Sequence, residues 1–481
     1  MTGHATSDAA GRELAVMVLA AGQGTRMRSA TPKVLHPVLG RTLLEWVLHA
    51  ARPLHPSRIV AVVSPSMAGG DALPTSIEGI EVEQAIQHEP RGSGDALRAG
   101  LATLEGLDGD VLVVNGDGAL FTTNTMGVLV AEHRGAGAAV SALGIPGDRS
   151  LPYGRLIATA DGMLERIVEA ADATPDELAI ELLNAGMYVF DRAAAATDVA
   201  GLDSDNSQGE HYITDMVTVA REAGRTVRAV AAGDAEELLG VNTRADLAEA
   251  ELVLQRRITQ GHLLEGVTFE RPDTTVVEPT VTIGRDATIL PGCILRGQTR
   301  IAAGATVGPY AVLDSVEVGE RASIVHSHGI DSRIDEDVSV GPFAYLRPGS
   351  RLRAQSKVGT FVETKNTDLG RGSKVPHLSY VGDATIGSGC NIGAGNITAN
   401  YRPELGSGKQ RTTIGDGVRT GSDNVLVAPV TLEEGAFTGA GSIITEDVPA
   451  GALAIARARQ VNLPDYARRL EGRSNAGAAG T

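Results

Sequence analysis

Short apolar runs alternate with helix-like segments through the first half of the chain. The runs are four or five residues long and hold almost no polar position, which is typical of strands buried in a parallel sheet. Between them, apolar residues recur at helical spacing. This alternation predicts a doubly wound α/β domain that binds ligands at the carboxyl ends of its strands. The predicted strands are residues 15–19, 59–63, 111–114 and 187–190, and the clearest helices are residues 43–51 and 95–104.

Beyond residue 280 the apolar positions recur every six residues, and glycine often follows the aliphatic residue, as in Val307-Gly308. Neither a helix nor an alternating strand has this period. A triangular coil does, because each flat face contributes one short strand with one inward aliphatic residue. A β-sandwich with evenly spaced turns is the alternative, but the length of the series favours a left-handed parallel β-helix of hexapeptide repeats. The series comprises Ile283, Ile289, Leu295, Ile301, Val307, Leu313, Ile334, Val340, Leu346, Leu352, Val358, Leu369, Val375, Val381, Ile386 and Ile392.

The segment between the two patterns, residues 244–262, is rich in Ala, Leu, Glu and Arg and contains no proline. It predicts one exposed helix that connects two domains, because 481 residues are too many for one ordinary core. We therefore expect an α/β domain at residues 1–243, a linker helix at 244–265 and a β-helix domain at 266–481. The small, polar tail from residue 474 is expected to be disordered.

The composition excludes several classes of function. Fifty-nine glycines and 3% aromatic residues suit a coil with tight corners and small core residues, and a net charge of −17 argues against a nucleic-acid partner or an anionic membrane. No stretch approaches the ~20 apolar residues that cross a bilayer. The N-terminus carries Asp8 and Glu13 instead of a basic signal region. Two cysteines, Cys293 and Cys390, make no disulfide framework, so we expect a cytoplasmic protein.

The first predicted strand runs directly into a glycine turn that is followed by basic residues. Gly22 and Gly24 allow a tight turn whose N–H groups face a polyphosphate, and the next helix is expected to add its N-terminal dipole. Arg26 and Lys33 supply cations suited to transferring phosphates. Asp117 follows a later predicted strand, at the sheet edge where a metal-bound substrate is expected. An aspartate in this position is more commonly a cap or turn residue.

A second cluster of polar residues interrupts the six-residue pattern around His377. Hexapeptide β-helices are associated with trimeric acyltransferases, although a fold alone fixes no chemistry. Acetylation of an amine needs a base, and an imidazole suits that role near neutral pH. A lone histidine is more often a surface residue, but Arg347, Lys365 and Tyr380 stand in the same stretch, and Glu363 has the chemistry to orient the imidazole. This cation-rich patch on an acidic protein predicts a site for a sugar phosphate.

The glycine turn, Gly-x-Gly-Thr-Arg-Met followed by Pro-Lys-Val-Leu at 32–35, resembles that of the nucleotide-sugar pyrophosphorylases. With Ile-Val-Glu at 167–169 and Tyr-Ile-Thr-Asp at 212–215, it is similar to the bifunctional N-acetylglucosamine-1-phosphate uridylyltransferases / glucosamine-1-phosphate N-acetyltransferases. The resemblance implies that Arg26 and Lys33 are catalytic, steadying charge as the sugar phosphate attacks UTP. It implies Mg²⁺ on Asp117 and Asn242. It also implies a nucleotide site of Leu19, Ala20, Ala21, Gly22, Lys33, Gln87, Gly92, Ser93, Asn115, Gly116 and Asp117, and a sugar-phosphate site of Gly154, Glu169, Asn184 and Asn242.

The β-helix carries the pattern of the same family in Leu-Arg-Pro-Gly at 346–349, Phe-Val-Glu at 361–363 and Asn-Ile-Gly-Ala-Gly at 391–395. This implies that His377 takes the proton while the amine of glucosamine-1-phosphate attacks acetyl-CoA. The product, N-acetylglucosamine-1-phosphate, is then coupled to UTP for cell-wall peptidoglycan synthesis. A homotrimer with its coenzyme A groove between subunits is also implied. The implied sugar-phosphate residues are Arg347, Lys365, Tyr380 and Asn391, and the implied acetyl-CoA residues are Ala394, Asn400, Tyr401, Ser422, Ala440 and Arg457.

Departures from the family pattern concentrate in the first half. The family's Leu-Gly-Thr-Gly-His is Arg-Gly-Ser-Gly-Asp at residues 91–95, and the loop at 402–409 in the second half is longer. The departing positions of the first half include Arg91, Asp95, Asn115, Ala119 and Ala185.

Three functions remain open at this point. The first is a bifunctional enzyme with both activities. The second is an enzyme with one activity, either an acetyltransferase with a weakened first domain or a nucleotidyltransferase with a regulatory β-helix. The third is a non-catalytic trimeric scaffold. A structural coil has no use for a clustered His377, Lys365 and Arg347, and the first half keeps its phosphate and metal residues, so the sequence favours the bifunctional enzyme.

Overall fold

The computed structural model describes residues 12–70, 72–206, 209–406 and 408–471. The chain forms two compact units, of which one ends at Arg257 and the other begins at Ile258. Cys293 and Cys390 are buried and free. Throughout the described ranges, no helix is both long and apolar enough to cross a membrane. The predicted disorder of the tail from residue 474 concerns residues outside these ranges.

The first unit is built on a ten-stranded sheet with the order β10-β9-β11-β7-β1-β4-β6-β5, in which β8 lies beside β11 and β12 beside β8. The central strands β7, β1, β4 and β6 are parallel. Their bounds are β1 (Glu13–Leu19), β4 (Arg58–Val63), β6 (Ile80–Ile86) and β7 (Gly109–Asn115), and the remaining strands are β5 (Ser76–Ile77), β8 (Val140–Pro146), β9 (Arg155–Ala158), β10 (Leu164–Val168), β11 (Leu182–Asp191) and β12 (Val227–Ala231).

One predicted parallel strand runs the other way. Residues 187–190 lie in β11, which pairs antiparallel with β7, so that Met187 faces Val114. The apolar run correctly indicated a buried strand. The direction of a strand depends on its partner and its connection, neither of which the run encodes, so the parallel assignment was wrong.

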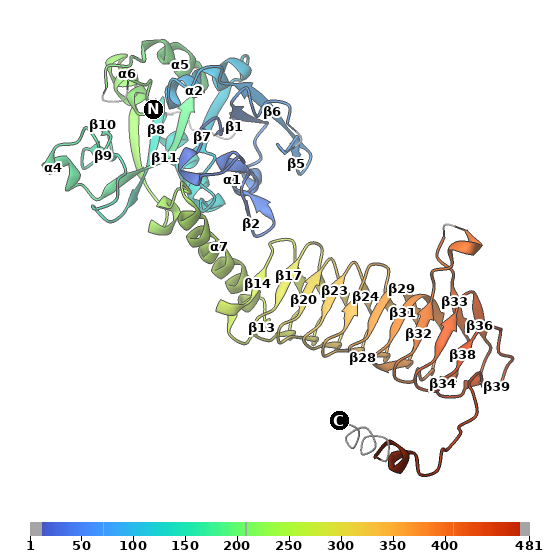
Figure 1. Ribbon diagram of the computed structural model, residues 1–481. Coiled ribbons are helices and arrows are strands. Elements are labelled where there is room, and N and C mark those ends of the chain that lie inside the picture. The colour runs from blue at the N-terminus through green and yellow to red at the C-terminus, as the bar shows by residue number, and fades with distance from the viewer. Residues whose placement is uncertain (1–11, 71, 207–208, 407, 472–481) are drawn as a thin grey trace, which may run out of the picture. The chain divides into compact units, whose positions relative to one another are not determined.

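Helices cover both faces of this sheet (Figure 1). Alternate residues of β1 and β7 point to opposite faces. On one face Val16 and Val18 pack with the helices α1 (Leu43–Ala51) and α3 (Thr123–Ala136). On the other, Ala15 and Met17 pack with α2 (Ser93–Thr103), α5 (Arg192–Asp198) and α6 (Met216–Glu222). The predicted helices at 43–51 and 95–104 correspond to α1 and α2, and a further short helix is α4 (Pro175–Leu178).

The segment predicted as a connector is one helix, α7 (Arg244–Leu264). It is not exposed all round, because Ala250, Val253 and Leu254 are buried. Val253 and Leu254 lie three and four residues after Ala250, the spacing that places side chains on one face of a helix. The prediction of an exposed helix was therefore wrong for this stripe, which the high content of charged residues concealed.

The second unit is a left-handed parallel β-helix whose coils stack in chain order (Figure 1). Every member of the predicted six-residue series is buried, and all of them belong to one continuous core. Successive coils pair in register, so that Val276 faces Ile294 and Ile294 faces Val312. The coil has three faces, and no pair of sheets packs as a sandwich among the described residues, so the β-sandwich alternative does not apply.

The strands of each face follow one another along the coil. The first face holds β14 (Val276–Val277), β17 (Ile294–Arg296), β20 (Val312–Asp314), β23 (His328–Ile330), β26 (Tyr345–Leu346), β29 (Glu363–Leu369), β31 (Tyr380–Ile386), β32 (Ile397–Ala399), β35 (Val425–Val427) and β38 (Ile443–Ile444). The second face holds β15 (Thr282–Ile283), β18 (Arg300–Ile301), β21 (Glu317–Val318), β24 (Arg333–Ile334), β27 (Arg351–Leu352), the ends of β29 and β31, β33 (Thr412–Ile414) and β36 (Val430–Leu432). The third face holds β13 (Thr268–Phe269), β16 (Thr288–Ile289), β19 (Thr306–Val307), β22 (Ser323–Ile324), β25 (Ser339–Val340), β28 (Lys357–Thr360), β30 (Lys374–His377), β34 (Arg419–Thr420), β37 (Phe437–Thr438) and β39 (Leu453–Ala454).

One corner of the β-helix carries a row of exposed apolar and aromatic side chains, here called the aromatic corner: Tyr310, His326, Phe343, Phe361 and Leu378. Neighbouring rings touch, and those of Phe343 and Phe361 stack with centroids 5.3 Å apart. All five residues have positive φ. For a residue with a Cβ, this left-handed conformation costs roughly 1–2 kcal/mol. Glycine would adopt this conformation without that cost. The presence of exposed side chains at these positions therefore indicates that the surface they form is functional.

Candidate active sites

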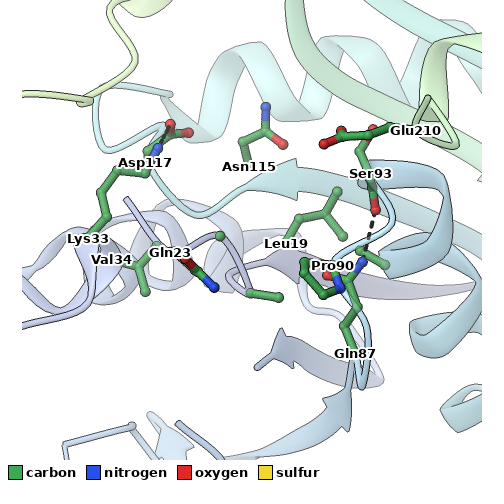
Figure 2. Close-up of a pocket in the computed structure, with 14 residues that line it drawn as sticks. Leu19, Gln23, Lys33, Val34, Gln87, Pro90, Ser93, Asn115, Asp117 and Glu210 are labelled. Atoms are coloured by element: carbon green, nitrogen blue, oxygen red, sulfur yellow. Dashed lines mark hydrogen bonds and ion pairs between the residues drawn. The ribbon is translucent and has the colours of Figure 1, made fainter. Parts of the chain in front are cut away.

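The first site is a cavity of about 420 Å³ at the carboxyl ends of β1, β6 and β7 (Figure 2). This is the sheet edge at which the strand pattern predicts a ligand. Most residues predicted to bind the nucleotide line the cavity, while Ala20 and Gly116 lie beneath it and form backbone hydrogen bonds to the sheet. The predicted residues in its lining are Leu19, Ala21, Gly22, Lys33, Gln87, Gly92, Ser93, Asn115 and Asp117.

The glycine turn after β1 approaches the cavity closely but does not lead into an α-helix. Gly22 has open space where a side chain would stand, and Gly24 has a φ of +63°. A Cβ on Gly24 would lie 2.5 Å from the Cβ of Lys33. The residues that follow form only a single 3-10 turn, Thr25–Met27. The predicted dipole of the next helix is therefore absent, because one turn aligns too few peptides. The helix N-terminus at this cavity belongs to α2, through Gly92 and Ser93.

The predicted metal and catalytic residues converge on one point. Lys33 Nζ donates to Asp117 Oδ2 at 2.5 Å and to Asn242 Oδ1 at 3.0 Å, and Arg26 donates to the same Asn242 oxygen at 2.8 Å. The Asp246 carboxylate holds the backbone N–H of Asn242 at 2.9 Å, at the start of α7. Two hard oxygens aimed at one cation fit Mg²⁺, which takes few protein ligands and completes its shell with water and phosphate. The described residues hold no cluster of three or more His, Cys, Asp or Glu suited to a metal.

A second cavity, of about 280 Å³, adjoins the first and shares Ser93, Asn115 and Asp117 with it. All four residues predicted for the sugar phosphate line it: Gly154, Glu169, Asn184 and Asn242. Asn184 Nδ2 donates to the Tyr188 hydroxyl at 2.8 Å. Burial, reinforced by the nearby carboxylates Asp215 and Asp172, raises the pKa of Glu169. Its carboxylate and the amide of Asn184 are suited to sugar hydroxyls.

Several lining residues were not among the predicted site residues. Gln23 and Glu210 line the nucleotide cavity, and Tyr153, Tyr188 and Thr214 line the sugar cavity. Tyr188 was concealed in the apolar run of β11, where its ring is buried and its hydroxyl reaches the cavity. Thr214 belongs to the Tyr-Ile-Thr-Asp motif and Tyr153 precedes the predicted Gly154, so the sequence contained a signal for both.

The departures from the family pattern differ in their relation to the cavities. Arg91 pairs with Glu89, both side chains being exposed. Ala119 is buried, whereas Asn115 lines both cavities and Ala185 lines the sugar cavity. The Asp95 carboxylate accepts a hydrogen bond from Gln87 at 3.3 Å.

In the β-helix, three predicted sugar-phosphate residues lie on neighbouring strands of the first face. Tyr380 faces Glu363 in register, Lys365 faces Gly382, and Arg347 directly follows β26. Glu363 does not orient His377, as we had expected. Its Oε1 accepts from Arg347 at 2.8 Å, because the coil places these residues on adjacent strands. The three cationic or hydroxyl groups remain directed to one patch.

His377 ends β30 on the third face, immediately before the aromatic corner, and it is exposed. Predicted acetyl-CoA residues follow it along this edge in successive coils. The N–H groups of Gly395, Asp423 and Gly441 donate to the carbonyls of His377, Ala394 and Ser422 at 3.3, 2.7 and 2.8 Å. Ala440 precedes Gly441, and the Arg457 side chain lies beside that glycine. The predicted set His377, Ala394, Ser422, Ala440 and Arg457 thus forms one row.

The remaining predicted residues of this site are more scattered. Asn400 is buried and donates to the Tyr380 hydroxyl at 3.2 Å and to Asp383 at 2.5 Å. Tyr401 is exposed, with Lys409 Nζ 4.3 Å from its ring centre. Asn391 lies on the third face between Lys374 and Arg419, away from the first-face patch. Within one chain, Asn391 is therefore the one predicted sugar-phosphate residue that the coil does not bring to the patch.

Comparison with known proteins identifies similar chains. Residues 16–214 match the family model of the MobA-like NTP transferase domain. The chain is 47% identical over 461 residues to the bifunctional protein GlmU of Corynebacterium efficiens, covering 95% of this chain and 94% of that protein. It is 45% identical over 465 residues to the bifunctional protein GlmU of Mycobacterium tuberculosis, covering 95% and 92%. It is 46% identical over 471 residues to that of Streptomyces avermitilis, covering 97% of each.

Proposed function

This chain belongs to the GlmU family of bifunctional proteins, and we propose that it performs the two reactions at the sites described above. In the β-helix, acetyl-CoA acetylates glucosamine-1-phosphate. In the first unit, UTP and N-acetylglucosamine-1-phosphate form UDP-N-acetylglucosamine, a precursor for peptidoglycan, and release pyrophosphate. One observation carries the proposal: Asp117 lines both cavities of the first unit and lies at the convergence of Lys33 and Asn242. Two phosphate-bearing substrates would meet at this one cationic centre.

For uridylyl transfer, the residues act by positioning and charge. Glu169 and Asn184 would hold the sugar hydroxyls, so that a phosphate oxygen of the sugar faces the α-phosphorus of UTP. That oxygen forms the new bond as the bond to pyrophosphate breaks. Arg26 and Lys33 offset the negative charge on the phosphates. Asp117 and Asn242 would hold Mg²⁺, which would supply further positive charge beside the phosphates when bound.

For acetyl transfer, Arg347 and Lys365 would bind the sugar phosphate and His377 would accept the proton of the attacking amine. The amine nitrogen bonds to the thioester carbonyl carbon, and coenzyme A leaves as its thiol. Substrate phosphate would replace Glu363 as the partner of Arg347, since both offer oxygens to the same guanidinium. The row from Ala394 to Arg457 runs away from His377 and offers a track for the coenzyme.

We propose that three copies assemble around the aromatic corner. Each chain carries a net charge of −17, so a contact surface without charged side chains limits repulsion between copies. The aromatic corner carries no carboxylate, Lys or Arg and adjoins His377. A second copy there would also supply the asparagine that the patch lacks within one chain.

Sedimentation tests this assembly. Phe361→Asp should reduce the particle mass from three chains to one and reduce acetyl transfer, while uridylyl transfer persists. The matched control is Phe437→Asp, an exposed phenylalanine on the third face. A Phe361→Asp protein that keeps the mass of three chains contradicts the proposal.

A cytoplasmic location is proposed on chemical grounds. The two cysteines are free and buried, as is usual where thiols are kept reduced.

The two activities are best tested in separate assays of the purified protein. The first supplies acetyl-CoA and glucosamine-1-phosphate, and the second supplies UTP, N-acetylglucosamine-1-phosphate and Mg²⁺. Asp117→Ala should abolish the second activity and leave the first, and His377→Ala should do the reverse, so each variant is the folding control of the other. A wild-type protein that shows only one of the two activities would instead be a single-reaction enzyme. A wild-type protein that shows neither activity would be a scaffold.

A further inference from the structure

The nucleotide cavity has two chemically different ends (Figure 2). Lys33 and Asp117 lie at one end, where the cationic centre would take the triphosphate. Gln87, Pro90 and Ser93 lie at the other end. A nucleoside triphosphate with its phosphates at the cationic end would therefore place its base beside Gln87.

The orientation of the Gln87 carboxamide is determined by its two partners. Its Nε2 donates to the carbonyl of Gly92 at 2.9 Å and to Asp95 Oδ2 at 3.3 Å. A carbonyl and an ionised carboxylate can only accept, so the amide NH₂ must face them and not the oxygen. Each of its two N–H groups has one partner. Gln87 lines the cavity, and within the described ranges its side chain makes hydrogen bonds only through Nε2. Oε1 is therefore the side-chain atom that remains to accept from a ligand.

Asp95 is held in place for this contact. It lies in the first turn of α2, where a carboxylate is favoured by the helix dipole. Its other oxygen, Oδ1, is 3.4 Å from Arg98 one turn further on. This is one of the positions at which the chain departs from its family pattern, which has histidine here. A histidine offers a donor or an acceptor according to its tautomer, whereas an aspartate offers acceptors alone.

We propose that Asp95 is a positioning residue that fixes the Gln87 carboxamide with Oε1 toward the base, and that this selects uracil over cytosine. The proposal rests on the uridylyl transfer proposed above. Uracil carries a hydrogen on N3 and donates it to Oε1. Cytosine has a lone pair on N3, which would face the lone pairs of Oε1. A site built to accept a particular N–H discriminates strongly against an analogue that lacks it.

The test compares kcat/KM for UTP and CTP in the full-length protein. Asp95→Ala should lower the UTP:CTP ratio about five- to tenfold, since one hydrogen bond that holds the amide is lost. The change should appear in the KM for UTP with kcat nearly unchanged, because base contacts are equal in the ground and transition states. Asp95→Asn keeps an accepting oxygen and should restore most of the ratio.

Controls separate this role from a structural one. Glu89→Ala, which removes an exposed carboxylate that pairs with Arg91, should leave the ratio unchanged. Acetyl transfer by each variant reports on the integrity of the chain. If Asp95→Ala folds poorly, Asp95→Ser is the substitute, because serine is favoured at a helix N-terminus. Its shorter side chain removes the carboxylate oxygen from Gln87, so it should lower the UTP:CTP ratio likewise. An unchanged ratio in these variants, or an equal fall in Asp95→Asn, overturns the proposal. A wild-type protein that does not use UTP refutes the proposed function itself.

Discussion

Glu169 is the residue of the sugar cavity whose protonation should be visible in kinetics. Because burial and two nearby carboxylates raise its pKa, it gains a proton at a higher pH than an exposed glutamate. As the pH falls through this raised pKa, the side chain ceases to be a charged acceptor for a sugar hydroxyl. The KM for N-acetylglucosamine-1-phosphate should therefore rise as the pH is lowered from neutrality, while the KM for UTP changes little.

Glu169→Gln provides the reference for this titration, because the phosphate of the substrate also titrates in the range. The variant should show a KM raised about tenfold at pH 7.5, consistent with the loss of one charged hydrogen bond. Its pH profile should be flatter than that of the wild type. Identical profiles for the two proteins would show that another group is responsible.

Asp246 should affect uridylyl transfer through the residue it holds. Its carboxylate accepts from the backbone N–H groups of Asn242 and Thr243 at 2.9 and 2.8 Å. Asp246→Ala should raise the Mg²⁺ concentration needed for half-maximal uridylyl transfer about tenfold, since an outer partner of a ligand typically contributes that much. Glu249→Ala, an exposed carboxylate on the same helix, is the control. Equal Mg²⁺ requirements in both variants would contradict this role.

At the residue scale, the sequence predicted which residues lie close together better than it predicted their contacts. Most residues predicted for the nucleotide, the sugar phosphate and the metal line two adjoining cavities, whereas Arg26, Ala20 and Gly116 do not. The partner of Glu363 was missed, because pairing across the coil joins residues 16 apart, a relation that depends on the number of residues in each corner. Tyr188 was missed because it lies in an apolar run, and the sequence pattern does not indicate where the hydroxyl group of a buried tyrosine lies.

At the scale of elements, the buried repeat positions should dominate the stability of the β-helix. Leu352 is fully buried in its core. Leu352→Ala should lower the free energy of unfolding of this unit by about 2–5 kcal/mol, the usual cost of a cavity at a buried leucine. Ile334→Val, also at a buried repeat position, should cost only about 1 kcal/mol. Urea unfolding followed by loss of acetyl transfer measures both. Similar small effects would mean that the coil relaxes around the cavity.

The six-residue period predicted elements well, while the prediction of their relations was less complete. All repeat positions point inward as predicted, because the six-residue spacing depends only on residues that are close together in the sequence. The antiparallel direction of β11 was missed because it depends on the pairing with β7, which an apolar run does not encode. The buried stripe of α7 was missed because only three of its positions are apolar and buried, among many charged ones.

At the scale of the whole molecule, the two units have separate cores. The cluster in the β-helix begins at Val267, and the two clusters of the first unit end at Leu238 and Val227. Separate cores predict separate unfolding transitions. Leu112→Ala should lower the urea midpoint for loss of uridylyl transfer and leave that for acetyl transfer unchanged. A single shared midpoint in the wild type and variant would show that the units unfold together.

The coil register also bears on how such a domain changes over evolutionary time. Val276, Ile294 and Val312 pair at intervals of 18 residues, yet Val312 pairs with His328 only 16 residues later. Corners therefore absorb small deletions, whereas one extra residue within a face would turn its inward side chains to solvent. Duplication of one whole coil would preserve every face and lengthen the prism by about 4.8 Å. Related β-helix domains should therefore differ in length by whole coils or by loops at the corners. Their genes should have grown in steps of one coil.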